Sequence, residues 1–197
     1  MKNKIQSRNN IIFIISLLVL SFSCSKDDNV KEGYKRFVGF AVLNSQADVY
    51  EFGQQGYNEV TGNLYIGSFN DNGQRYFPLS TLDTDITDLS PLNSIERIRG
   101  DLYILGNPLM TQLHGLENLK LVEGLTMAIN LNESLTVISG LNNLESIGDY
   151  IYIGNNPALV NYCGLANLFE KDLDLEYGIS LNFNNPTPEE ITNSVCY

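Results

Sequence analysis

Apolar residues recur along this chain with a period of about 24 residues. Four units that open with L-x-x-(L/I) begin at Leu92, Leu116, Leu141 and Leu165. Successive units start 24, 25 and 24 residues apart. A period in this range is typical of solenoids, in which stacked repeats bury an apolar face that no repeat buries alone.

Each unit predicts a short strand followed by a turn. Pairs such as Leu102/Ile104 and Ile151/Ile153 alternate with other residues, which is the period of a strand. The L-x-x-L-x-x-I run has a spacing of three, which suits a turn or 3₁₀ segment. The pattern therefore predicts a mainly β fold: a right-handed β-helix or leucine-rich-repeat-like solenoid, with one short parallel strand per coil of about 24 residues.

Two residue types mark the corners of the coils. An Asn follows the predicted strands at Asn107, Asn132 and Asn156. Its side chain satisfies backbone groups in a turn, and stacked coils should align these amides into a ladder. A Gly precedes the next Leu at Gly115, Gly140 and Gly164, where a tight corner favours a residue without Cβ.

The ends of the solenoid depart from the repeat. Ser45 precedes a short amphipathic segment that predicts a capping helix with a Ser N-cap and a Gly stop. Residues 68–84 form an insertion between the first coil and the next. A last, degenerate coil is expected around Leu181, Phe183 and Asn185-Pro186.

The first 23 residues predict a lipoprotein signal peptide. They combine a basic start with an apolar run at 11–20, too short to span a bilayer of about 30 Å, and they end before Cys24. Ser21 stands where a lipobox usually has an aliphatic residue, so a plain signal peptide is the alternative. The chain then divides into a signal peptide (1–23), a polar tether (24–40), an N-terminal helical cap (41–59) and a solenoid with a C-terminal cap (60–197).

Two cysteines remain if Cys24 carries lipid. An even pair in an exported chain predicts a disulfide, here Cys163–Cys196. In the chain-entropy model, closing this loop of 33 residues stabilises the fold by roughly 3–4 kcal/mol. Free buried thiols are one alternative. Half of a metal site is the other, although the chain has one His.

The charge argues against two classes of partner. Without residues 1–23, 9 basic and 23 acidic residues remain, a net charge of about −14. This charge disfavours nucleic acid and anionic membranes, so contact with a membrane is expected only through lipid on Cys24. Solubility of a surface protein explains the same charge.

The pattern I-x-G-x-L-x-I-x-x-N-x-x-L-x-x-L-x-x-L, present in Ile98–Leu119 and Ile147–Leu168, resembles the receptor L domain. That family is the leucine-rich-repeat-like β-helix of the insulin and epidermal growth factor receptor ectodomains, and bacterial surface lipoproteins carry similar modules. The resemblance covers roughly residues 46–197. It implies a binding fold with protein ligands among its receptor members, but it carries over no contact residue.

A shorter resemblance concerns export. Cys24-Ser25-Lys26-Asp27-Asp28 resembles a surface-export signal of some Gram-negative lipoproteins. It implies an outer-membrane lipoprotein that faces outward.

No set of residues predicts catalysis, and we expect no enzyme, cofactor or metal. His114 lies beside Gly115, which suits an exposed turn residue. Asp101 and Asp149 occupy similar strand-entry positions two coils apart, roughly 10 Å, and are the weak basis for a hydrolytic alternative. Residues 70–73 resemble half of a calcium loop without the distal Glu, so a polar turn is the simpler interpretation.

The candidate binding face is aromatic. If the neighbouring aliphatic residues point inward, one face of the sheet carries Tyr65, Tyr103 and Tyr152, with Ala128 interrupting the row. The row is either a cross-strand ladder that stabilises the sheet or a flat recognition platform.

Together these features predict a surface-anchored, non-enzymatic binding or adhesion module for an extracellular protein or glycan. The alternatives are a carbohydrate-active β-helix, which binds or hydrolyses glycans, and a structural envelope lipoprotein.

Overall fold

The computed structural model of the chain describes residues 33–69, 73 and 84–193, and these described residues belong to one compact unit. The predicted signal peptide, the lipidation site Cys24, most of the insertion and Cys196 therefore lie outside the described residues. Within the described ranges, no helix has both the length and the apolar character needed to cross a bilayer.

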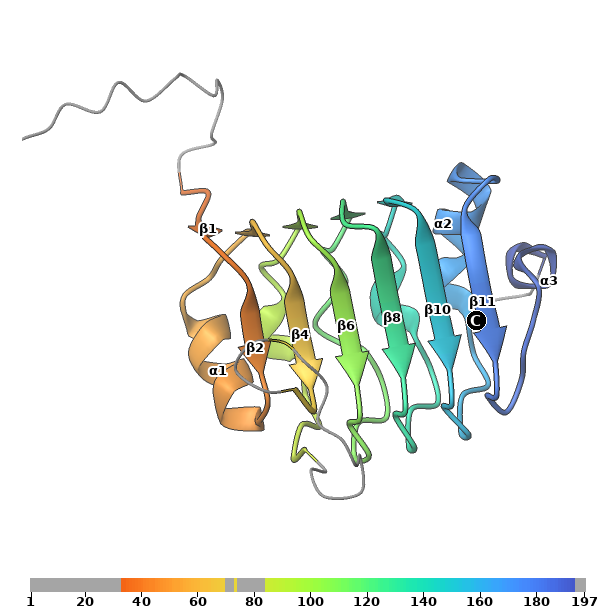
Figure 1. Ribbon diagram of the computed structural model, residues 1–197, viewed down its shortest axis with the longest axis horizontal. Coiled ribbons are helices and arrows are strands. Elements are labelled where there is room, and N and C mark those ends of the chain that lie inside the picture. Colours follow the sequence, from red (N-terminus) through yellow and green to blue (C-terminus); the bar gives the residue numbers. More distant parts are fainter. Residues whose placement is uncertain (1–32, 70–72, 74–83, 194–197) are drawn as a thin grey trace, which may run out of the picture. The chain divides into compact units, whose positions relative to one another are not determined.

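The fold is mainly β, and from β1 to β10 the chain contributes strands alternately to two parallel sheets (Figure 1). A sheet of five two-residue strands consists of β1 (Arg36–Phe37), β3 (Glu59–Val60), β5 (Arg97–Ile98), β7 (Leu121–Val122) and β9 (Ser146–Ile147). A sheet of six longer strands consists of β2 (Ala41–Leu43), β4 (Leu64–Gly67), β6 (Leu102–Leu105), β8 (Thr126–Asn130), β10 (Tyr150–Gly154) and β11 (Glu176–Ser180). Neighbouring strands in each sheet come from successive repeats, so the parallel pairing builds the sheets one repeat at a time.

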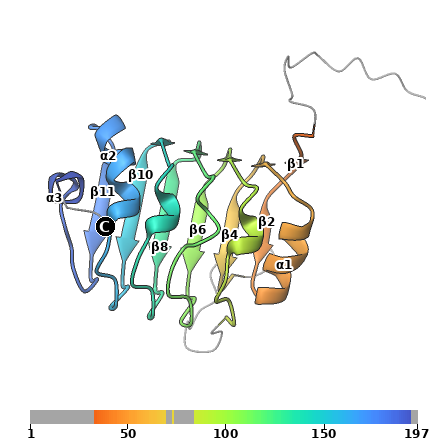
Figure 2. The ribbon, with the colours of Figure 1, turned by 180° about the vertical axis from the view of Figure 1, so that it is seen from behind.

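Turns and short helices follow the long strands and lead to the next short strand or, after β10, to β11. They are α1 (Gln46–Gln54), η2 (Ser90–Leu92), η3 (Ser139–Leu141), η4 (Cys163–Leu165) and α2 (Ala166–Lys171), and α3 (Pro188–Thr192) follows the last strand. Seen from behind, α1, the turns and α2 lie in front of the six-stranded sheet (Figure 2). The L-x-x-L spacing of three thus forms 3₁₀ turns, as the sequence predicts.

The expected single strand per coil is wrong, because a full repeat supplies two. The second strand lies inside the L-x-x-L-x-x-(V/I) run: Val122, for example, belongs to β7 and pairs with Ile98 of β5 and Ile147 of β9. Two residues are too short to display the alternation that identifies a strand in a sequence. Parallel pairing between repeats, rather than local propensity, defines these strands.

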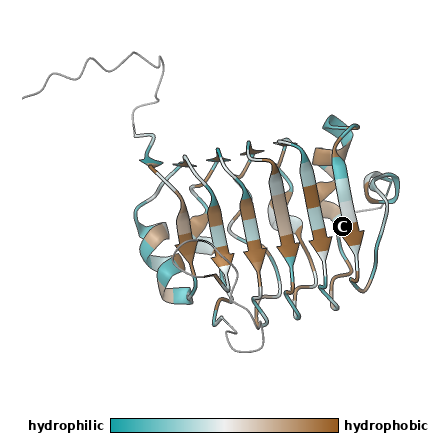
Figure 3. Cartoon of the chain, viewed as in Figure 1, coloured by the Kyte–Doolittle hydropathy of each residue, from teal (hydrophilic) through white to brown (hydrophobic). Residues whose placement is uncertain are grey.

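Residues in register form apolar columns through the interior. The leucines that open the four units, Leu92, Leu116, Leu141 and Leu165, are all fully buried. The inward positions of the long strands stack in the same way, as in the fully buried series Leu64, Leu102, Met127 and Ile151. In Figure 3, brown bands cross the strands of this sheet, while α1 and α3 show teal patches.

The predicted Asn ladder is confirmed. Its central residues, Asn107, Asn132 and Asn156, are fully buried. Asn132 Nδ2 donates to the Ile104 carbonyl oxygen at 3.1 Å and to Asn156 Oδ1 at 3.2 Å. Asn132 Oδ1 in turn accepts from the backbone N–H and Nδ2 of Asn107, both at 3.1 Å. Each amide therefore bonds to the repeats on both sides of it.

The predicted corner glycines mark close approaches between repeats. A Cβ on Gly140 would overlap the carbonyl oxygen of Leu113, and one on Gly164 would overlap that of Ile138. Only Gly115 of the three also has a left-handed φ, of +112°. The main requirement at this corner is thus space for the backbone of the preceding repeat.

The N-terminal helix begins as predicted. Ser45 is its N-cap, and a capping box joins the Ser45 Oγ to the Asp48 N–H and the Asp48 carboxylate to the Ser45 N–H. Val49 is fully buried against the core, and Gly56, just past the helix, has a φ of +65°. The helix occupies the place that the 3₁₀ turns take in later repeats.

The fold includes residues ahead of this cap. Strand β1 lies within the segment 24–40 suggested as a tether, and it pairs with β3. The Glu59 side chain, 1% exposed, contacts Arg99 Nε at 2.7 Å and Arg36 Nε at 3.3 Å, and it accepts from the Tyr34 hydroxyl at 3.2 Å. These contacts fix the chain to the fold from Tyr34 onward.

The expected last coil is displaced. Leu181 and Phe183 were expected in a degenerate coil, but they are 68% and 69% exposed. The last strand is instead β11, and Asn182, rather than Asn185, continues the ladder by accepting from Asn156 Nδ2 at 3.0 Å. The sequence does not reveal this coil, because its residues depart from the repeat. Gly178 stands in register with Tyr152, and Tyr177, in register with the buried Ile151, is 45% exposed.

Candidate functional site

The predicted strand phase of the tyrosine row is confirmed. Leu64 and Ile66 are fully buried, whereas Tyr65 between them is partly exposed. Tyr65 is in register with Tyr103, then Ala128, then Tyr152. The three tyrosines therefore share the outer face of the six-stranded sheet, and Ala128 separates the second from the third.

Tyr65 and Tyr103 form a stack. Their ring centroids lie 5.3 Å apart with an angle of 4° between the planes. Phe69, which follows β4 and is 1% exposed, packs against both rings with centroid distances of 5.0 and 6.3 Å. This stack is therefore a fixed aromatic wall, because each ring is held by at least one other.

Polar residues at the strand entries orient the two hydroxyl groups. Asn63 Nδ2 donates to the Tyr65 hydroxyl at 2.7 Å, and the Tyr103 hydroxyl donates to Asp101 Oδ2 at 3.2 Å. Burial, together with the neighbouring Asp101 carboxylate, raises the pKa of Tyr103 to about 12. Tyr103 is thus a neutral phenol at physiological pH, and both rings lean toward the beginnings of their strands.

Tyr152 leans the opposite way. A Cβ on Gly154, two residues later, would overlap the Tyr152 hydroxyl, so the ring extends toward the end of its strand. A hollow of about 320 Å³ lies between this ring and the Tyr65–Tyr103 stack. Its remaining lining includes Phe69, Leu105, Ala128 and Asn130.

Asn130 is the polar group of this hollow. It is 8% exposed, and its Oδ1 accepts from Asn155 Nδ2 at 3.0 Å. Among the described residues, Asn130 Nδ2 has no hydrogen-bond partner. This Nδ2 is not among the buried side-chain atoms that lack a partner, so it reaches the solvent in the hollow. A solvent-accessible amide donor set among aromatic rings can bind an acceptor group of a ligand.

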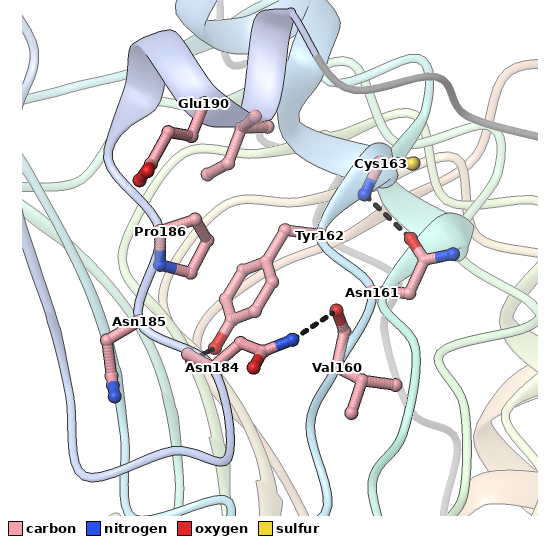
Figure 4. A pocket seen from close by; sticks show the side chains of 9 residues that line it. Val160, Asn161, Tyr162, Cys163, Asn184, Asn185, Pro186 and Glu190 are labelled. Atoms are coloured by element: carbon pink, nitrogen blue, oxygen red, sulfur yellow. Dashed lines mark hydrogen bonds between the residues drawn. The ribbon is translucent and has the colours of Figure 1, made fainter.

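A second hollow of about 620 Å³ lies at the C-terminal end, between η4 and α3 (Figure 4). The Tyr162 hydroxyl donates to the Asn184 carbonyl oxygen at 2.6 Å, and Asn184 Nδ2 donates to the Val160 carbonyl oxygen at 3.3 Å. Burial raises the pKa of Tyr162. The polar groups of this second hollow thus connect the last repeat to the C-terminal segment, and their role is structural.

The two carboxylates weighed for catalysis do not form a pair. Thr126 of β8 is in register with Tyr150 of β10, which is one residue after Asp149. On the other side of β8, Leu102 pairs with Met127, so Asp101 lies opposite Thr126. The expectation of equivalent positions is therefore wrong by one residue. Asp101 already accepts bonds from the Thr126 N–H at 2.9 Å and from Tyr103.

His114 contacts Glu117 at the surface. Its side chain is 64% exposed, and Nδ1 lies 2.6 Å from Glu117 Oε1. Elsewhere in the described ranges, no group of three or more His, Cys, Asp or Glu side chains is placed to hold a metal ion. Cys163 is half-buried at the start of η4, and its predicted partner Cys196 is outside the described residues.

Comparison with known families identifies the class of protein. Residues 58–170 match the family model described as Receptor L domain. Because this match spans more than half of the chain, the chain belongs to the receptor L domain family. No curated protein matches the chain.

Sequence reasoning missed two members of the site. Phe69 lies in the insertion, where no repeat position predicts its contacts. Asn130 is the last residue of β8, two positions before Asn132 of the ladder, and no repeated position in the sequence marks it. The one available signal for it was the strand alternation, which places Ala128 and Asn130 on the same face.

Proposed function

We propose that this chain is a non-enzymatic ligand-binding module that uses the outer face of its six-stranded sheet. The family assignment supports a ligand-binding module in general. The observation that carries the proposal is the stacked Tyr65–Tyr103 wall beside a hollow with an unused amide donor on Asn130. Rigid aromatic rings provide contact area at little cost in conformational entropy.

We further infer that the two parallel sheets and the turns that connect them form an L-domain-type solenoid. It is right-handed, as parallel crossovers normally are. A solenoid face presents residues from several repeats in one plane. The tyrosines come from three different repeats, which supports recognition of an extended partner, either an extracellular protein or a glycan. Binding without hydrolysis is favoured because Asp101 is committed to hydrogen bonds.

The binding test uses Tyr65→Ser, Tyr103→Ser and Tyr152→Ser together in the mature chain. We expect the triple variant to lose most binding to partners found on glycan and protein arrays. It should lose only modest stability, since outward cross-strand pairs contribute roughly 0.2–1 kcal/mol each. Binding is measured on the arrays and stability by thermal unfolding.

The control is the pair Tyr50→Ser and Tyr177→Ser, which removes two exposed tyrosines outside this face. It should retain array binding. Normal binding by the triple variant, combined with a much lower melting temperature, would assign the row a structural role and contradict the proposal.

We propose that the protein is anchored to the outer membrane by lipid on Cys24 and faces outward. The support is the short apolar run, the Cys at its end and the polar residues that follow. Cys24→Ala should abolish incorporation of labelled fatty acid and release the protein from the membrane. Cys163→Ala is the matched control and should remain labelled; equal labelling of the two variants would contradict the anchor.

We also propose a Cys163–Cys196 disulfide that holds the C-terminal segment to the last repeats. Export to an oxidising compartment and the even number of remaining cysteines support it. Mass spectrometry of the non-reduced exported protein should detect the linked peptide. Two alkylated thiols in mature protein would rule it out.

A further inference from the structure

The interruption of the tyrosine row is the feature that defines the hollow. In register with Tyr103 and Tyr152, the strand between them carries Ala128. A tyrosine at this position would stack on Tyr103 as Tyr65 does, at about one strand spacing. The missing ring therefore leaves a space between two aromatic walls.

The floor of this space combines apolar and polar character. Ala128 is 7% exposed and Leu105 4%, and Asn130 beside them has an Nδ2 without a partner among the described residues. This Nδ2 is not among the buried side-chain atoms that lack a partner, so it reaches the solvent in the hollow. Water can accept from it in the free protein, and an acceptor oxygen of a ligand can replace that water. The occupant should therefore carry an acceptor oxygen next to an apolar face.

The width of the space limits the shape of the occupant. Tyr103 and Tyr152 start from strands two spacings apart, about 9.6 Å at the backbone. A flat ring between two stacked rings needs about 7 Å, because each carbon contact is about 3.5 Å. Tyr103 leans toward the start of its strand and Tyr152 toward the end of its own, so the two rings are offset along the strands. A puckered ring, with hydrogens and hydroxyl groups on both faces, fills this wider space better than a flat ring does.

Charge further limits the class of ligand that fits the hollow. The described residues that line the hollow are uncharged, and the mature chain has a net charge of about −14. Among the described residues, no group in the lining would neutralise an anionic or a cationic ligand. We propose that this hollow binds one neutral sugar ring of a glycan, with its apolar face against the tyrosines and a hydroxyl or carbonyl oxygen accepting from Asn130 Nδ2. The inference rests on the proposed function and names its ligand class.

The test uses methyl glycosides of glucose, galactose, mannose and N-acetylglucosamine as probes of the mature chain. We expect saturation transfer to at least one glycoside, and a shift of the Asn130 side-chain amide resonance on titration. N-acetyltyrosinamide and N-acetylprolinamide stand for a peptide partner. Binding of only these peptide probes, or of no probe at all, would overturn the inference.

Ala128→Tyr is the decisive variant, because it supplies the missing ring and fills the hollow. It should weaken glycoside binding about tenfold or more while the protein remains folded. Ala128→Ser is the matched control and should bind normally. Asn130→Ala leaves the space open and should weaken binding by about two- to tenfold. Asn130→Ala keeps the test decisive if Ala128→Tyr does not fold. Unchanged glycoside binding by both Ala128→Tyr and Asn130→Ala would overturn the inference.

Failure of the inference is distinguishable from failure of the proposed function. An array partner that is lost with the triple Tyr→Ser variant but kept with Ala128→Tyr would leave the binding face intact and reject the sugar in the hollow. An array partner kept by all variants would reject both.

Discussion

We expect Asn132→Ala to lower the free energy of unfolding by about 3–5 kcal/mol. The substitution removes the side-chain partner of two buried backbone groups, the Ile104 carbonyl oxygen and the Asn107 N–H. It also removes one of the two bonds of Asn107 Nδ2, which keeps the Ile66 carbonyl oxygen. Each unsatisfied buried group costs about 1–3 kcal/mol. A loss of this size is a large fraction of the total stability of a typical domain, which is about 5–15 kcal/mol. Chemical denaturation followed by circular dichroism measures it.

Two further variants isolate the cause. Asn143→Ala removes the same side chain from an exposed site with one bond, to the Glu117 carbonyl oxygen at 2.7 Å, and should cost less than about 1 kcal/mol. Asn132→Asp keeps the shape but cannot donate to Ile104, so it should destabilise nearly as much as alanine. Equal, small losses for Asn132→Ala and Asn143→Ala would show that the ladder contributes little.

The sequence predicted those parts of the fold that each repeat specifies by itself. The opening leucines, the Asn ladder and the corner glycines each recur at fixed spacing, and each lies where the spacing places it. The two-residue strands could not be found, because they exist only through pairing with other repeats. The last coil was misplaced because it lacks the Leu and Asn spacing of the others.

The candidate site was predicted in part. Strand alternation correctly placed the tyrosines and Ala128 on one face. The directions in which the rings lean, the burial of Phe69 and the unused donor of Asn130 depend on neighbours from other repeats. A single sequence contains these residues but does not contain their contacts.

We expect Gly140→Ala to destabilise the fold by about 2–3 kcal/mol through overpacking between repeats. The new Cβ would overlap the carbonyl oxygen and carbon of Leu113, which are backbone atoms that no rotamer change can move. Gly140 has no left-handed φ, so conformational strain of the alanine is not the reason. Relief requires the two repeats to move apart, which stretches the parallel hydrogen bonds between them.

Gly154→Ala is the matched control for this argument. Its Cβ would meet the Tyr152 side chain, which can swing aside, and its φ is also outside the left-handed region. We therefore expect a cost below about 1 kcal/mol. The comparison measures free energies of unfolding for both variants under the same conditions. Equal losses in the free energy of unfolding for Gly140→Ala and Gly154→Ala would show that contact at the corner does not limit the spacing between repeats. The hydrogen bonds of the two sheets alone would then set the distance at which the repeats stack.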